Sequence, residues 1–161
     1  MASNSGGNGA ELSRLESQLE RAVEGALCSI VLLDRIPNSL IEISICILDD
    51  ESASSSCDHL VPDAVNAAVV AVVAAAIEVQ DVVSCCQVGL TGSSGIVMDP
   101  SAGECLNGHC TICYSAVHNE VVQVQVQLSE QVAEERVKEA VQWAIDGAVA
   151  IREVMVKALG K

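Results

Sequence analysis

The hydrophobic residues of the first third of the chain follow two different periods. From Glu11 onward they recur three and four residues apart, at Leu12, Leu15, Leu19, Val23, Leu27 and Ile30. This spacing predicts an amphipathic helix, which should end before Pro37 because the residue preceding a proline avoids helical backbone angles. Over Leu40 to Leu48 the period becomes two, with isoleucine at positions 41, 43, 45 and 47. Strict alternation of this kind predicts a strand with one buried face.

The next hydrophobic stretch, Pro62 to Ile77, has no polar face. It ends in eleven consecutive Ala, Val and Ile residues. A helix that is apolar all round is either buried in a protein core or spans a membrane. This stretch would rise only about 24 Å, which is short of the roughly 30 Å hydrocarbon core of a bilayer. Acidic residues also bracket both of its ends, at Asp63 and Glu78. We therefore expect a core helix, with Pro62 in its first turn.

Four shorter segments after this helix have strand character. We expect strands over residues 81–90 and 96–98, joined by a turn at Thr91 to Gly95, and then a hairpin of residues 109–117 and 121–128. In the second arm of the hairpin, Val122, Val124, Val126 and Leu128 alternate with Gln123, Gln125 and Gln127. This alternation predicts that the aliphatic side is buried and the glutamine side is solvated.

A long helix should close the chain. Ser129 is placed to cap it, with Glu130 in its first turn. Its expected buried stripe consists of Val137, Val141, Ala144, Ala148, Ile151, Met155 and Leu159. Together these elements predict an α/β fold of the α+β type, with a mixed sheet packed against helices. Residues 1–10 are expected to be a disordered tail, and residues 11–161 a single domain.

Charge and composition narrow the range of functions that the chain could have. The formal net charge is −14, with only eight Lys and Arg residues, and the aromatic residues are one Trp and one Tyr. An acidic chain with few aromatics lacks both the cations that bind phosphates and the rings that stack on bases. Direct contact with RNA or DNA is therefore not expected. The segment Met1 to Gly9 is polar and has no secretory leader pattern, so we expect the eight cysteines to be reduced and intracellular.

A group of thiols and imidazoles is the strongest candidate for metal binding. Cys105, Cys110 and Cys113 have spacings found in zinc and iron–sulfur sites, and His109 and His118 lie nearby. If residues 109–117 form a strand, however, Cys110 and Cys113 point to opposite faces of the sheet. Buried or scattered thiols are then the better interpretation, and no metal or cofactor is assigned.

Other candidate sites are weaker still. Cys85 and Cys86 are adjacent in a predicted strand and should point apart, so a redox pair between them is not expected. The Thr91 to Gly95 turn lacks the lysine of a phosphate-binding loop. The acidic run Asp49, Asp50 and Glu51 could bind Mg²⁺ or act in acid–base catalysis, and a solvated loop is the simpler reading. No catalytic residue is assigned.

The order of these segments resembles the C-terminal half of RNase PH-like domains. The matching pieces are Arg35 to Ser39 after the first helix, the segment Ile41 to Leu48, Asn66-Ala67-Ala68 in the core helix, and Val97-Met98-Asp99-Pro100. The resemblance runs from about Leu12 to Leu159 and is nearest to the non-catalytic ring subunits of the eukaryotic RNA exosome. It implies the RNase PH C-terminal-half fold, and a partial domain, because the N-terminal half of the family has no counterpart. Surface that this half normally covers should be exposed.

A departure from the family pattern bears on catalysis. Phosphorolytic members carry Asp-x-Leu-x-Ala-Asp-Gly-Gly, and the matching run here is Cys46 to Ala53. Cys46 takes the place of the first aspartate, Glu51 that of the second, and both glycines are absent. Because a thiol does not replace a carboxylate oxygen around Mg²⁺, we expect an inactive site.

The resemblance therefore implies a non-catalytic structural subunit of an exosome-type complex for RNA processing, including rRNA processing, and RNA degradation. Its implied partners are other RNase PH-like ring subunits and RNA-binding cap subunits. RNA would be contacted only through the assembly, with no membrane or DNA involved. Residence in the nucleus, including the nucleolus, and in the cytoplasm is implied with it. The alternatives are a phosphate-dependent 3′–5′ exoribonuclease that uses Asp49, Asp50 or Glu51, and a cysteine-based metal-binding module.

Overall fold

The structure, a computed structural model, describes residues 7–48, 59–92, 95–100, 104, 106–129 and 132–160. Its elements follow in the order α1 (Gly7–Ile30), the 3₁₀ helix η1 (Leu33–Arg35), α2 (Leu60–Ala74), β1 (Ser84–Thr91), β2 (Ile96–Met98), β3 (Leu106–Ser115), β4 (Glu120–Leu128) and α3 (Glu134–Ala158). None of the helices in the described ranges is long and apolar enough to cross a membrane.

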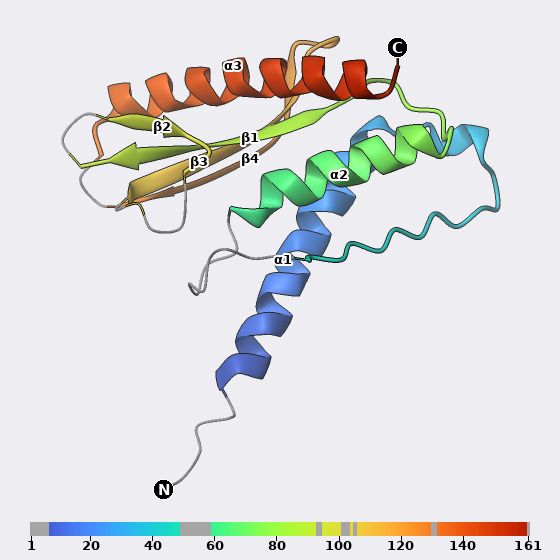
Figure 1. The fold of residues 1–161 in the computed structure, drawn as a ribbon, viewed down its shortest axis with the longest axis horizontal. Coiled ribbons are helices and arrows are strands. Elements are labelled where there is room, and N and C mark those ends of the chain that lie inside the picture. Colours follow the sequence, from blue (N-terminus) through green and yellow to red (C-terminus); the bar gives the residue numbers. More distant parts are fainter. Residues whose placement is uncertain are drawn as a thin grey trace, which may run out of the picture.

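The four strands form one sheet in the order β2-β1-β3-β4, and all three pairings are antiparallel. Helix α3 covers one face of the sheet, and α1 and α2 cover the other (Figure 1). Each face has its own core: Cys86, Val88 and Leu90 of β1 face α3, whereas Cys85 faces α1 and α2. The predicted α+β class, a sheet packed against helices, is confirmed.

The central helix α2 is buried on one side and open on the other. Val61, Val65, Val69 and Val72 are almost completely buried, whereas Ala67, Ala71 and Ala74 are exposed. The helix ends at Ala74, not at the predicted Ile77, because Ala76 adopts a left-handed backbone with φ of 57°. The N–H groups of Ala76 and Ile77 donate to the carbonyl oxygens of Val73 and Val72, which is a Schellman ending.

Within the described ranges, the predicted strand over Leu40 to Leu48 is not part of a sheet. Its backbone is extended, and no backbone hydrogen bond joins residues 37–48 to another segment of the described chain. The alternation itself is present: Ile41 and Ile43 pack against the helical core, and Glu42 and Ser44 are exposed. The prediction of a paired strand was wrong because a strand also needs a neighbour for its N–H and C=O groups, which sequence alternation does not supply.

Two details of the C-terminal part also differ from expectation. The side chains of Val124, Val126 and Leu128 are 56%, 42% and 39% exposed, because β4 is the edge strand and α3 packs on β1 and β3. The predicted burial of the aliphatic side of this strand was therefore wrong.

Helix α3 begins at Glu134 after Ala133, so Ser129 does not cap it. Instead the Ser129 N–H donates to the Asn107 carbonyl and extends the β3–β4 pairing.

The buried stripe predicted for the last helix agrees closely with the structure, whereas the first helix begins earlier than expected. No member of the predicted α3 stripe is exposed, and Ala140 and Gly147 join it. At the other end, α1 begins at Gly7 and therefore includes part of the expected tail over residues 1–10. Residues 1–6 of that tail, and Glu130, lie outside the described ranges.

Candidate functional site

A concave surface of the described chain lies on the outer side of the α1–α2 layer. It is a groove of about 880 Å³ between these helices and the extended segment of residues 39–47. Apolar side chains of α1 and α2 line it, namely Leu19, Val23, Leu27, Ala64 and Val72, together with four isoleucines of the extended segment. Three glutamates, Glu16, Glu20 and Glu24, lie at its α1 side on successive helical turns and are exposed.

The extended segment runs back past α1 and α2 as a separate strand of chain (Figure 1). Asn38, with a left-handed φ of 59°, turns the chain into this segment after η1. Ile45 and Ile47 are 44% and 48% exposed, although they also line the groove. The outer wall of the groove is therefore a strand-like element that the rest of the described chain leaves half uncovered.

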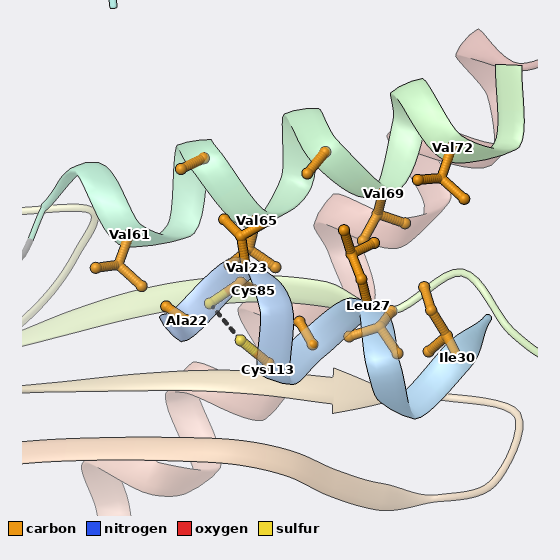
Figure 2. Close-up of a cluster of buried hydrophobic side chains, with 14 of the residues drawn as sticks. Ala22, Val23, Leu27, Ile30, Val61, Val65, Val69, Val72, Cys85 and Cys113 are labelled. Atoms are coloured by element: carbon orange, nitrogen blue, oxygen red, sulfur yellow. Dashed lines mark hydrogen bonds between the residues drawn. The ribbon is translucent and has the colours of Figure 1, made fainter. Parts of the chain in front are cut away.

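The helices beneath the groove are packed firmly against the sheet. Figure 2 shows Val23 and Leu27 of α1 interlocking with Val65 and Val69 of α2 above two cysteine side chains of the sheet. Asn66 ties α2 directly to β1: its Nδ2 donates to the Cys85 carbonyl over 2.9 Å, and its Oδ1 accepts from the Cys85 N–H over 2.7 Å. The floor of the groove is thus held in place by apolar packing and by this amide pair.

The two cysteines in Figure 2 are cross-strand neighbours. Cys85 pairs with Cys113, and their Sγ atoms are 2.9 Å apart. Because the Cys85 backbone points to Asn66, the two cysteines form a non-hydrogen-bonded pair, in which side chains approach most closely. The hydrogen bond with Cys113, together with burial, raises the pKa of the Cys85 thiol well above its ordinary value. Sequence reasoning missed this contact because it compared only cysteines that lie close together in the chain, whereas Cys85 and Cys113 are 28 residues apart.

Those candidate metal ligands that the structure describes are dispersed. Cys110 belongs to the core under α3, and Cys113 to the core under α1 and α2, as their odd spacing predicted. His118 lies in the exposed turn after β3, and Cys105 lies outside the described ranges. Within the described residues no group of three or more His, Cys, Asp or Glu side chains could hold a metal ion. Likewise Cys85 and Cys86 point to opposite faces of β1, as predicted.

Asp49, Asp50 and Glu51 lie outside the described ranges, so their arrangement stays a prediction. Cys46, which takes the place of the first aspartate in the family pattern, is exposed on the side of the extended segment opposite to the isoleucines. Its thiol is therefore available to solvent and is not part of either core.

An acidic site that sequence reasoning passed over lies at the far end of the sheet. The Asp81 side chain is 1% exposed and accepts hydrogen bonds from Ser115 Oγ, from the N–H groups of Val82 and Val117, and from Arg152 Nη2. Burial alone would raise the pKa of this carboxyl, but the hydrogen bonds outweigh it and hold the pKa below the ordinary value. The available signal was the position of Asp81 directly before the apolar residues Val82 and Val83 of the predicted strand.

Comparison with known proteins agrees with this architecture. Residues 81–147, from the start of β1 into α3, match the C-terminal RNase PH domain, described as 3′ exoribonuclease family, domain 2. The crystal structure of rice (Oryza sativa) Rrp46 superposes with a TM-score of 0.68 over 89% of the chain, at 19% sequence identity. The chain has an RNase PH-like fold. It spans 65% of the length of rice Rrp46, and no curated protein sequence matches it significantly.

The resemblance seen in the sequence is therefore confirmed at the level of the fold. The sheet and the first part of α3 carry the family match, and the superposition, which covers 89% of the chain, extends well beyond them. Since about a third of rice Rrp46 has no counterpart here, the groove lies on a fold that is only partly represented in this chain.

Proposed function

We propose that the chain is a non-catalytic structural subunit of an exosome-type complex for RNA processing and degradation. The observation that carries the proposal is the structural similarity to Rrp46, an exosome ring subunit, over most of the chain. On this proposal its partners are other RNase PH-like ring subunits and RNA-binding cap subunits, and it resides where they do, in the nucleus, including the nucleolus, and in the cytoplasm. RNA contacts are supplied by the neighbours, as the net charge of −14 favours.

The non-catalytic assignment is supported by Cys46. In the family pattern an aspartate at this place serves catalysis and metal binding, whereas the exposed thiol here is a poor ligand for Mg²⁺. An acidic subunit can still contribute to an assembly, because charge complementarity with basic neighbours speeds association and selects partners.

The assembly proposal is tested by affinity purification of the tagged chain from native lysate, with identification of co-purifying proteins by mass spectrometry. We expect other RNase PH-like subunits and cap subunits in stoichiometric amounts. Their absence, while an Rrp46 control purified in parallel recovers them, would overturn the proposal. The fold would then be shared without the assembly role.

The rival function is a phosphate-dependent 3′–5′ exoribonuclease, which the description of the matching family favours. In such a reaction phosphate attacks the 3′-terminal phosphodiester and releases a nucleoside diphosphate from the shortened RNA. We expect the purified chain to release no nucleoside diphosphate from a single-stranded RNA in the presence of phosphate and Mg²⁺. Release that disappears in Asp50→Asn would establish the rival function instead.

The third candidate function is a cysteine-based metal-binding module. It predicts stoichiometric zinc or iron in the purified protein, and metal analysis decides it.

A further inference from the structure

The side chains of Cys85 and Cys113 have the arrangement that a cross-strand disulfide requires. The two residues lie opposite one another on β1 and β3, and their Sγ atoms are closer, at 2.9 Å, than the van der Waals contact of two sulfur atoms. They form a non-hydrogen-bonded pair, a type in which the Cα atoms lie about 4.5 Å apart. This separation is within the range of roughly 4.4–6.8 Å that disulfides span. A bond between the sulfurs therefore needs no change of strand register.

A second pair of cysteines on the same two strands lacks this arrangement. Cys86 lies opposite Ile112, and Cys110 lies opposite Val88, so the two cysteines are diagonal neighbours on the face that α3 covers. Diagonal neighbours have Cα atoms about 7–8 Å apart, and cysteines more than about 7 Å apart are not bridged without backbone movement. The four cysteines within β1 and β3 thus divide into a pair that is ready to bond and a buried pair that is not.

Apolar side chains of α1 and α2 cover the Cys85–Cys113 pair (Figure 2). The two residues are 0% and 2% exposed, whereas Cys28 and Cys46 are exposed. The hydrogen bond from Cys113, together with burial, raises the pKa of the Cys85 thiol, which leaves little of the reactive thiolate. Reaction of this pair therefore requires the helical layer to open. Burial sets the rate of the reaction, and the cross-strand geometry sets the stability of its product.

We propose that Cys85 and Cys113 are a redox modification site, at which a low-molecular-weight disulfide such as oxidised glutathione links β1 to β3. One cysteine loses its proton, and its thiolate attacks a sulfur of the oxidant. The S–S bond of the oxidant breaks and releases one glutathione thiolate. The other cysteine, also deprotonated, then attacks the protein sulfur of the mixed disulfide and releases the second glutathione. The two protein thiols lose two electrons, and the oxidant gains them as it becomes two thiols.

The modification would make the stability of the fold depend on the redox state of its surroundings. The bond joins two positions that are 28 residues apart and so restricts the unfolded chain. By linkage, a bond that stabilises the folded chain is itself favoured by folding to the same extent. We expect the linked chain to unfold at a temperature roughly 5–10 °C above that of the reduced chain. This inference goes beyond the proposed subunit function and does not depend on it.

The test brings the full chain to equilibrium with glutathione. The chain is unfolded in denaturant and refolded in buffers of different reduced and oxidised glutathione concentrations, so that burial does not limit the reaction. Free thiols are then alkylated, and mass spectrometry after proteolysis measures the fraction of chains with a link between the β1 and β3 peptides. Half-formation is expressed as the squared concentration of reduced glutathione divided by that of oxidised glutathione. We expect this value to be about a hundredfold or more above that of the chain kept in denaturant.

Single substitutions identify the two sulfurs, because Cys85 is adjacent to Cys86 and peptide masses alone do not separate them. Cys85→Ala and Cys113→Ala should each lower the linked fraction by at least about tenfold. Cys86→Ala and Cys110→Ala are the matched controls, since they remove buried thiols from the same two strands. Both controls should keep the link, because their thiols face α3.

Three results would overturn the proposal. The link could fail to form in the wild type even when all the glutathione supplied is oxidised. It could persist undiminished in Cys85→Ala or Cys113→Ala, which would assign it to other sulfurs. The linked chain could also unfold at the same temperature as the reduced chain or at a lower one, which would show that the folded geometry does not favour the bond. None of these readouts requires ring subunits or RNA, so they are separable from failure of the proposed subunit function.

Discussion

The guanidinium of Arg152 lies 3.1 Å from the Asp81 carboxylate, joining the last helix to the chain that enters β1. The Asp81 side chain is 1% exposed and that of Arg152 is 26% exposed. Removal of one partner leaves a buried charge with fewer compensating groups, at a cost of about 3–5 kcal/mol in fully buried pairs. Because Arg152 is partly solvated, we expect Arg152→Met to cost toward the lower end of that range. Chemical denaturation measures the loss.

The same pair allows a double-mutant cycle. Asp81→Asn should also destabilise the fold, and the double variant should lose less stability than the sum of the single losses, by about 1 kcal/mol or more. Glu134 and Lys138, an exposed ion pair on α3, provide the control. The cycle Glu134→Gln with Lys138→Met should give a coupling of roughly 0.5 kcal/mol or less. Strict additivity at Asp81 and Arg152 would contradict the prediction.

Stability should depend on pH through Asp81. The pKa of this carboxyl is lowered in the folded chain from its ordinary value of 3.8, so its charged form stabilises the fold above that value. The contribution is lost as pH falls through the lower, folded-state pKa. The difference in unfolding free energy between the wild type and Asp81→Asn should therefore shrink as pH is lowered below about 4. Comparing the two proteins cancels the pH dependence that comes from the other carboxylates, because both proteins contain them. A difference in unfolding free energy that does not change with pH would contradict the assignment to Asp81.

The end of α2 offers a stabilising substitution. Ala76 has a φ of 57°, a conformation that costs an L-residue about 1–2 kcal/mol and costs glycine far less. Ala76→Gly should keep the Schellman hydrogen bonds and raise the unfolding free energy by roughly 0.5–1 kcal/mol, after the greater chain entropy of glycine is subtracted. The matched control is Ala71→Gly, exposed in the helix interior, which should lower stability by about 1 kcal/mol. Thermal unfolding of both variants shows whether each gains or loses stability. A loss of stability in Ala76→Gly would contradict the prediction.

Gly147 lies where α3 packs tightly against the sheet. A Cβ atom at this position would lie 2.6 Å from Cys86 Sγ and 3.2 Å from Met98 Cε. Although alanine favours helix by about 1 kcal/mol over glycine, we expect Gly147→Ala to destabilise by a net 1–3 kcal/mol, roughly, through overpacking. Cys86→Ala should be destabilising alone. Combined with Gly147→Ala, however, it should recover part of the stability that Gly147→Ala loses. Denaturant titration of the four proteins checks the pattern, and equal losses with and without Cys86 would place the strain elsewhere.

Sequence periodicity predicted most of the elements, because α1 and α3 each bury one apolar face against the rest of the fold. It could not predict pairing: Ile41 to Ile47 alternate as in a strand, yet the described chain holds no neighbour for them. It also could not place β4 at the edge, where Val124 and Val126 pass beyond the cover of α3. In the candidate site the apolar residues were evident, but the groove arises from the relative position of two helices and a segment, which no local pattern encodes.

Asn66 closes a stretch of the β1 edge that would otherwise be open to pairing with other chains. Strand β2 is three residues long and pairs only with residues 88–90, so β1 would present open backbone groups at Cys85. The Asn66 amide satisfies both of them from α2. An open, uncharged stretch of β1 in a run of buried residues would be a template for aggregation. One side chain of the helix thus protects the sheet against uncontrolled growth at this end.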